Sequence, residues 1–383
     1  MAAKASGENG GGGIPELSLH PALLVDRSIA IYGPSGTGKT VCTKAIMRAL
    51  DGHIEQVLIV APTEPTNRSY DGFVDPTLIH YSLCLARDEG ARGEPKKKQL
   101  TEKQKALNFL EEIWARQEMM ASIYKRANKL KTLASLYERL PRQARHAGNA
   151  YVSGLQRKRE RALAEIDKKW GKEPATREEK RHEAKEKFEK LLILIYKKFL
   201  TDHVAELWGR KDISEDERYS LAYLHFNPRL LLIFDDCAAQ LKTLLATEIW
   251  RKLFYQNRHS YITLVLCCQD DTDLNTNLRK NAFISIFCSE IVCTSYFERT
   301  ANKFPKRTRD YVSGASSKIF ARKRQKIAYM REDAKGCHFY AFNPPTVKKQ
   351  VFGSGALSEL CSQVRASGTA MDQTNPYFSK FKL

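Results

Sequence analysis

The sequence lacks the features by which membrane and exported proteins are recognised. Its apolar runs are short, such as LLILIY at 191–196, whereas a helix that spans a membrane needs roughly 20 predominantly apolar residues. The N-terminal stretch MAAKASGENGGGGIPE contains no apolar signal core and is typical of a flexible tail. We therefore expect no integral membrane segment and no secretion signal.

The cysteines do not form a recognisable metal-binding or disulfide pattern. There are nine of them, and no two stand in a Cys-x-x-Cys arrangement, which argues against a zinc site. Several lie inside apolar, strand-like runs, among them Cys267, Cys268 and Cys288. An odd number of cysteines without a secretion signal predicts reduced thiols and an intracellular location.

Acidic residues are scarce relative to basic ones. The chain has 63 Lys and Arg against 44 Asp and Glu, a net charge of +19. Such an excess favours a polyanionic partner, nucleic acid before an anionic membrane, although it also serves simply to keep a surface soluble. The hydrophobic fraction of 42% is enough to form a core, so the chain is not wholly disordered.

What the sequence does contain is the phosphate-binding motif G-x-x-x-x-G-K-[ST] in the stretch IYGPSGTGKT. In this motif, glycines let backbone N–H groups turn toward phosphates, the lysine reaches the β and γ oxygens, and the final hydroxyl binds Mg²⁺. The strand-like RSIAIYG precedes it and the helical TVCTKAIMRAL follows it, which is the context that the motif requires. The predicted nucleotide-binding residues are Gly33, Pro34, Ser35, Gly36, Thr37, Gly38, Lys39 and Thr40.

Two acids follow a second strand-like run, RLLLIFDDC at 229–237. Its apolar residues suit a strand covered on both faces, and open α/β sheets bind ligands at the C-terminal ends of their strands. We expect Asp235 to bind Mg²⁺ together with Thr40, and Asp236 to orient or deprotonate an attacking water. The alternative is that the two acids only cap the next helix.

Further strand-like runs complete a sheet. Gln269 stands at the end of one of them, where its amide is placed to sense a γ-phosphate or position water; the alternative is a buried glutamine bonded to backbone. Because helical segments separate the runs, the sequence predicts an α/β fold with a doubly wound, mostly parallel sheet. The runs are 55–63, 261–271 and 281–289, followed by a closing β-hairpin at 326–333 and 337–345.

The motifs resemble those of one group of phosphate-loop proteins. GTPases need Asn-Lys-x-Asp, and the candidates ANKL and ANKF lack the Asp, so a GTPase switch is disfavoured. The region 257–287 resembles FtsK and HerA-type DNA-pumping ATPases. More closely, the chain resembles the genome-packaging ATPase of poxviruses and other nucleocytoplasmic large DNA viruses, over 27–82 and 226–345. The resemblance is carried by GPSGTGKT, VAPTEPTNRSYDGF, LLLIFDD and NRHSYITLVLCCQ.

This resemblance implies a ring-forming motor, a pentamer or hexamer, that hydrolyses ATP with Mg²⁺ to move double-stranded DNA into a capsid. It implies that Arg258 is the finger that reaches the γ-phosphate of a neighbouring subunit, with Arg279 as the second candidate. A capsid or portal-vertex protein is a further candidate partner, and the host-cell cytoplasm, the virus factory or the virion is the implied location. The alternatives are a cellular or mobile-element DNA pump and a nucleotide-gated DNA- or capsid-binding assembly protein.

A basic, helical insertion is expected between the second and third strands. Apolar residues three or four apart predict a helix that passes through 107–124 and ends before Pro141. Two more helices are expected at 149–170 and 176–208. They form either a solvated hairpin or a basic surface for DNA phosphates or an acidic partner. The expected divisions are a Gly-rich tail at 1–20, an ATPase core at 21–85 and 226–345, the insertion at 86–225 and a C-terminal tail at 346–383.

Overall fold

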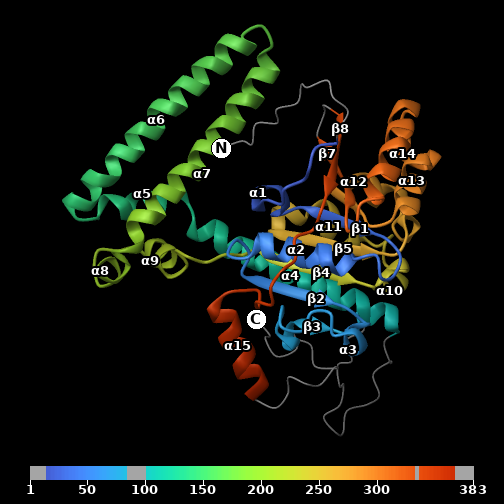
Figure 1. Ribbon diagram of the computed structural model, residues 1–383. Helices are drawn as coiled ribbons and strands as arrows, with labels where there is room; N and C mark the ends of the chain where they lie inside the picture. The colour runs from blue at the N-terminus through green and yellow to red at the C-terminus, as the bar shows by residue number, and fades with distance from the viewer. Residues whose placement is uncertain (1–13, 84–100, 333–335, 367–383) are drawn as a thin grey trace. The chain divides into compact units, whose positions relative to one another are not determined.

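The computed structural model describes residues 14–83, 101–332 and 336–366, which form two compact units (Figure 1). The first unit takes in the chain up to Glu118 and from Arg229 onward, and the second is Met119–Pro228. None of the helices in these described ranges combines the length and the apolar character needed to cross a membrane.

The observed division differs from the expected insertion at 86–225. Helix α4 (Glu102–Ala127) starts in the first unit, where Phe109, Ile113 and Trp114 are buried in a core shared with the sheet. Because these apolar side chains need the sheet to cover them, the early part of the helix belongs with the core rather than with the insertion.

The expected tails also differ from what is observed in the described residues. Leu17 is buried and Glu16 forms a bridge with Ala341, so part of 1–20 packs on the first unit. At the other end, Gly355–Ala366 forms helix α15 with Leu357 buried. The remainder of both expected tails, and residues 84–100, lie outside the described ranges.

The first unit contains an eight-stranded sheet in the order β3-β2-β4-β5-β1-β6-β7-β8. The six strands from β3 to β6 run parallel, and β7 and β8 are antiparallel to their neighbours. The predicted α/β fold with a mostly parallel sheet is thereby confirmed. The strands are β1 (Ser28–Tyr32), β2 (Gln56–Val60), β3 (Ile79–His80), β4 (Leu230–Asp235), β5 (Ile262–Cys268), β6 (Ile284–Phe287), β7 (Lys326–Glu332) and β8 (Gly336–Phe342).

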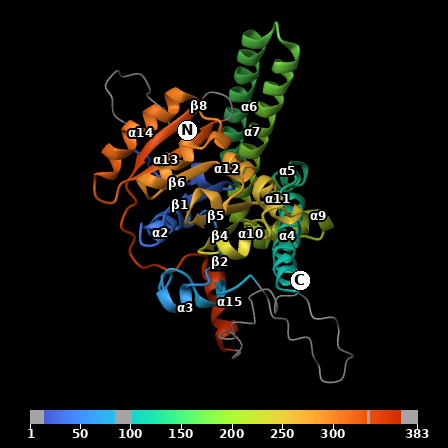
Figure 2. The same cartoon turned by 90° about the vertical axis from the view of Figure 1, so that its right-hand side faces the viewer.

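Helices cover both faces of this sheet (Figure 2). Ile29 and Ile31 of β1 pack toward α2, whereas Ala30 and Tyr32 face a second cluster that includes α4, α11, α13 and α14. This alternation follows from the two-residue period of a strand, and it explains why every residue of β1 is buried. The helices are α1 (Pro21–Leu24), α2 (Lys39–Leu50), α3 (Glu64–Asn67), α10 (Ala238–Lys242), α11 (Glu248–Tyr255), α12 (Thr276–Asn281), α13 (Glu290–Glu298) and α14 (Lys306–Phe320), with 3₁₀ turns η1 (Pro76–Leu78), η2 (Asn257–Ser260), η3 (Asp271–Asp273) and η4 (Thr300–Asn302).

The second unit is helical. The expected helices at 149–170 and 176–208 correspond to a long pair, α6 and α7, although α6 begins earlier and the second run divides into α7 and α8. The helix expected to end before Pro141 divides in the same way, into α4 and α5. A small core joins α5, α7, α8 and α9 through Leu133, Leu136, Leu200 and Leu207, among others. The elements are α5 (Leu130–Glu138), α6 (Arg142–Trp170), α7 (Pro174–Thr201), α8 (Val204–Trp208) and α9 (Glu215–Ala222).

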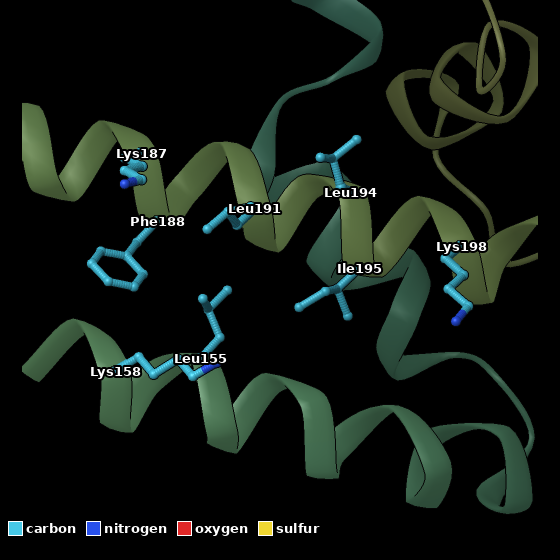
Figure 3. A pocket seen from close by; sticks show the side chains of 8 residues that line it. All are labelled: Leu155, Lys158, Lys187, Phe188, Leu191, Leu194, Ile195 and Lys198. Carbon is cyan, nitrogen blue, oxygen red and sulfur yellow. The ribbon is translucent and has the colours of Figure 1, made fainter. Parts of the chain in front are cut away.

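Helices α6 and α7 leave an apolar groove between them, of about 550 Å³ (Figure 3). Leu155 extends from α6 toward α7, while Phe188 and Ile195 point from α7 toward α6. Within these two helices, Gly148 and Leu200 are the buried residues. The hairpin is therefore largely solvated, and contact of its basic side chains with DNA or an acidic partner stays a prediction.

Candidate active site

The phosphate motif folds as a loop between β1 and α2. Gly38, at the N-cap of α2, has φ of 94°, which L side chains rarely adopt. Gly33 is needed for space, since a Cβ there would lie 2.6 Å from the Thr37 hydroxyl oxygen and 2.9 Å from the Cβ of Cys288. The buried Lys39 ammonium donates to the carbonyl oxygens of Gly33 at 2.8 Å and Pro34 at 3.2 Å. The loop thus lies between a strand and a helix, as the motif requires, and binding of phosphate by the loop and its lysine stays a prediction.

Asp235, the last residue of β4, lies beside the start of α2. Its Oδ2 accepts a hydrogen bond from the Thr40 hydroxyl at 3.3 Å and another from the Tyr70 hydroxyl at 2.7 Å. Burial raises the pKa of Asp235, and the Tyr70 hydrogen bond opposes that shift. The structure therefore brings together the hydroxyl and the carboxylate that the sequence assigns to Mg²⁺.

Tyr70 is held in place by a carboxylate that sequence reasoning did not single out. Glu64 is buried and accepts hydrogen bonds from the backbone N–H groups of Ser69 at 2.8 Å and Tyr70 at 2.7 Å. These bonds fold the segment after β2 so that the fully buried Tyr70 points at Asp235. In the sequence, the segment VAPTEPTNRSYDGF belongs to the family resemblance, but nothing in it shows that Tyr70 meets Asp235.

Asp236 follows directly, with an unusual backbone and an unusual side chain. Its φ is 55°, in the left-handed region that few non-glycine residues adopt. Its Oδ2 lies 3.5 Å from the Thr63 hydroxyl, at the limit of a hydrogen bond. Its Oδ1 is buried and accepts no hydrogen bond within the described part of the chain. An unpartnered buried carboxylate oxygen is costly, so Asp236 is suited to a ligand or a water.

Gln269 stands between the loop and the acids. In the sheet register Cys268 pairs with Tyr32 and Cys267 pairs with Asp235, so the ends of β1, β5 and β4 are level. Gln269 comes one residue after β5, and its side chain is exposed. The alternative of a buried glutamine is therefore not what the structure shows, and a role of the exposed amide at a phosphate stays a prediction.

The two candidate fingers are placed very differently. Arg258 is exposed on η2, before β5, and therefore at the opposite end of that strand from Gln269. Arg279 is 5% exposed, and its guanidinium lies 2.6 Å from the fully buried Asp271, which Arg299 also contacts at 2.8 Å. Since Arg279 neutralises a buried carboxylate, its placement favours a structural role. The choice of Arg258 stays a prediction.

Comparison with known proteins gives the family. No protein-family model matches the chain. Protein B354L from a Kenyan pig isolate of African swine fever virus is 43% identical over 370 residues, which cover 97% of both chains. Protein B354L of the Vero-adapted Badajoz strain matches with the same identity and coverage. The chain belongs to the B354L family of African swine fever virus proteins.

The B354L family confirms the expected relation to nucleocytoplasmic large DNA viruses, since African swine fever virus is one of them. Among solved structures, the genome-packaging NTPase B204 of Sulfolobus turreted icosahedral virus 2 in complex with ATP-gammaS covers 82% of this chain and 96% of its own, at 11% identity and a TM-score of 0.31. VirB4 of Thermoanaerobacter pseudethanolicus covers 84% of this chain and 89% of its own, at 12% identity and a TM-score of 0.33. Similarity at that level is weak, and the assignment of a phosphate-loop fold to this B354L relative rests on its own sheet and loop.

Proposed function

We propose that this chain is an ATP-hydrolysing, double-stranded DNA translocase that packages a viral genome, acting as a ring of identical subunits in the infected cell. ATP hydrolysis is supported above all by the hydrogen bond of 3.3 Å from the Thr40 hydroxyl to Asp235 beside the phosphate loop, with Asp236 adjacent. Binding alone does not need an acid with an unpartnered buried oxygen at that place.

The residues present fit ATP and Mg²⁺. Hydroxyl and carboxylate oxygens are the ligands that Mg²⁺ prefers beside substrate phosphates, and Thr40 and Asp235 supply one of each. When bound, Mg²⁺ would neutralise negative charge on the phosphates. In the free chain, the Lys39 ammonium donates to loop carbonyl oxygens. Phosphate oxygens would replace these acceptors, because they carry more negative charge.

Hydrolysis requires one water and one proton acceptor. The oxygen of water attacks the γ-phosphorus, the bond from that phosphorus to the β–γ bridging oxygen breaks, and ADP and inorganic phosphate form. We assign the proton of the attacking water to the Asp236 carboxylate, whose Oδ1 has no other partner in the described residues. Gln269 orients the water or the γ-phosphate from the adjacent strand end.

Double-stranded DNA is proposed as the partner because of the net charge of the chain and the family resemblance. The net charge of +19 suits sequence-independent contact with phosphates. The resemblance to packaging ATPases of large DNA viruses implies that the DNA moves into a capsid and that the subunits form a ring. A capsid or portal-vertex protein would then be the partner that receives the DNA.

The test is a phosphate-release assay on the full chain, with and without linear double-stranded DNA. We expect DNA to stimulate the wild-type rate. Asp236→Asn should bind ATP as the wild type does and lose a factor of roughly 10² or more in kcat, since it removes the general base. Lys39→Ala should instead weaken nucleotide binding, because the loop loses its ammonium.

Each outcome separates the candidate functions. If Asp236→Asn hydrolysed ATP at the wild-type rate, the assignment of the base would be wrong. A wild-type chain that bound ATP and DNA without DNA-stimulated turnover would instead be a nucleotide-gated binding protein.

A further inference from the structure

Lys326 is a second lysine at the phosphate loop, from a distant part of the chain. It is the first residue of β7, which runs antiparallel to β6 with Ile327 opposite Phe287. The antiparallel direction brings the start of β7 to the sheet edge at which the parallel strands end. The phosphate loop is at that same edge, next to β6, because β1 pairs with β6.

The Lys326 ammonium contacts one peptide of that loop. Nζ donates to the carbonyl oxygen of Thr37 at 2.8 Å. A Cβ built on Gly38 would lie 3.8 Å from the same Nζ, so the ammonium packs against the Thr37–Gly38 peptide itself. The side chain is half-buried, which strengthens the hydrogen bond relative to one in water.

The two polar groups of that peptide are linked by its geometry. A trans peptide is planar, so the Thr37 carbonyl and the Gly38 N–H point in opposite directions. In a phosphate loop the N–H groups must face the phosphates. Gly38, at φ of 94°, is a residue whose backbone turns easily, because glycine has no Cβ to oppose rotation.

We propose that Lys326 is a positioning residue of the nucleotide site, which fixes the Thr37–Gly38 peptide with its N–H toward the bound phosphates. A cation on the carbonyl also polarises the peptide and makes its N–H a stronger donor. The proposal rests on the proposed nucleotide-binding function. Under this proposal, the β7–β8 hairpin contributes Lys326 to the nucleotide site, a contribution that the phosphate motif alone does not reveal.

The experiment measures the affinity of the full chain for ADP and for ATPγS by calorimetry, in wild type, Lys326→Met and Lys326→Arg. Lys326→Met keeps an unbranched apolar side chain as long as the lysine stem to Cε and removes the donor. We expect the Kd of both nucleotides to rise by roughly tenfold, the effect of losing one charge-assisted hydrogen bond. The kcat at saturating ATP should change by less than about threefold, because the chemistry lies with other residues. Lys326→Arg should recover most of the affinity.

The matched control is Lys323→Met, which removes the same charge from an exposed lysine three residues away. It should bind both nucleotides as the wild type does. Lys326→Gln, which keeps a neutral N–H donor, gives a second variant should methionine impair folding, and it should fall between wild type and Lys326→Met. Circular dichroism melting of every variant reports whether a loss of affinity follows a loss of fold.

Three results would overturn the inference. Equal affinities of Lys326→Met and Lys323→Met would mean that the contact has no effect on the loop. Loss of ATPγS affinity with unchanged ADP affinity would mean that Lys326 binds the γ-phosphate directly rather than through the peptide. Failure of the wild type to bind either nucleotide would overturn the proposed function and this inference together, whereas the first two results leave that function intact.

Discussion

Asp235 shows how the cost of a buried carboxylate is offset by its neighbours. Tyr70 and Thr40 donate to it, and the charge of Lys39 lowers its pKa, while burial and the adjacent Asp236 raise it. A divalent cation at Thr40 and Asp235 would remove much of the remaining penalty. Under the proposed function, the residues that bond to Asp235 in the free protein would also surround the bound cation.

His80 is a buried titratable group away from that site, and it makes stability depend on pH. It lies on β3 with its ring 5.2 Å from that of Phe109, and burial lowers its pKa to about 4. The unfolded chain takes up a proton near pH 6.5, whereas the folded chain does not until about pH 4. The contribution of His80 to the free energy of unfolding is thus complete above pH 6.5, and it is lost as the pH falls toward 4. We expect the free energy of unfolding to fall by about 2 kcal/mol between pH 7 and pH 5 from this residue.

The measurement is urea unfolding at several pH values, for wild type and His80→Leu. Other groups titrate equally in both proteins, so the difference in slope reports His80. The variant should show a shallower dependence between pH 7 and pH 5, whatever its absolute stability. Parallel curves would contradict the assignment.

At the scale of elements, α5 and α6 of the second unit meet in a close contact at Tyr137 and Gly148. The Tyr137 hydroxyl is a donor within reach of two acceptors on α6. These are the carbonyl oxygen of Arg145 and Oδ1 of Asn149, each at 3.1 Å. This approach is open only because Gly148 has no side chain, since a Cβ there would lie 2.0 Å from the Tyr137 hydroxyl oxygen. The glycine is therefore a packing residue in a helix that would otherwise favour alanine.

Two glycines of α6 provide a matched pair of substitutions. Gly148→Ala should destabilise the protein by roughly 1–3 kcal/mol, because Tyr137 must move and lose its contacts. Gly154→Ala meets nothing within 4 Å and should stabilise the helix by up to about 1 kcal/mol. Thermal unfolding followed by far-UV circular dichroism compares the two, and a change of the same sign in both would show that the Tyr137 contact does not control stability.

At the scale of the whole molecule, the position of Arg258 bears on the proposed ring. β5 separates it from Gln269, and a strand of this length spans about 20 Å at roughly 3.3 Å per residue. An exposed arginine at that distance does not easily reach the nucleotide of its own subunit. It would reach the nucleotide of a neighbour if subunits pack head to tail, the arrangement that closes into rings.

We expect Arg258→Ala to bind ATP normally and to lose a factor on the order of 10³ or more in hydrolysis, the range for a finger supplied in trans. Mixing it with Lys39→Ala should restore part of the activity. Mixed rings contain interfaces at which an intact loop meets an intact arginine. The measurement is a titration of one inactive variant with the other, with assembly followed by light scattering. Mixed assemblies that stay inactive would remove Arg258 as a trans finger.

The sequence by itself determined the elements that carry local signals. Strands β1, β4 and β5 are mostly apolar runs, and a sheet covered on both faces buries them along their whole length. The phosphate loop is set by glycines and a lysine that are close in the chain. Gln269 and the acids were predictable because each follows such a run, and the ends of parallel strands meet at one edge.

The tertiary structure alone decided which distant residues complete the site. Tyr70 reaches Asp235, and Lys326 reaches Thr37, across separations that leave no local pattern. The same holds for Arg279, which sequence reasoning offered as a finger and which the fold pairs with the buried Asp271. These partners depend on strand order, on the antiparallel register of β7 and on the burial of each charge. Most buried polar groups find a hydrogen-bond partner, but only the packed chain determines which one.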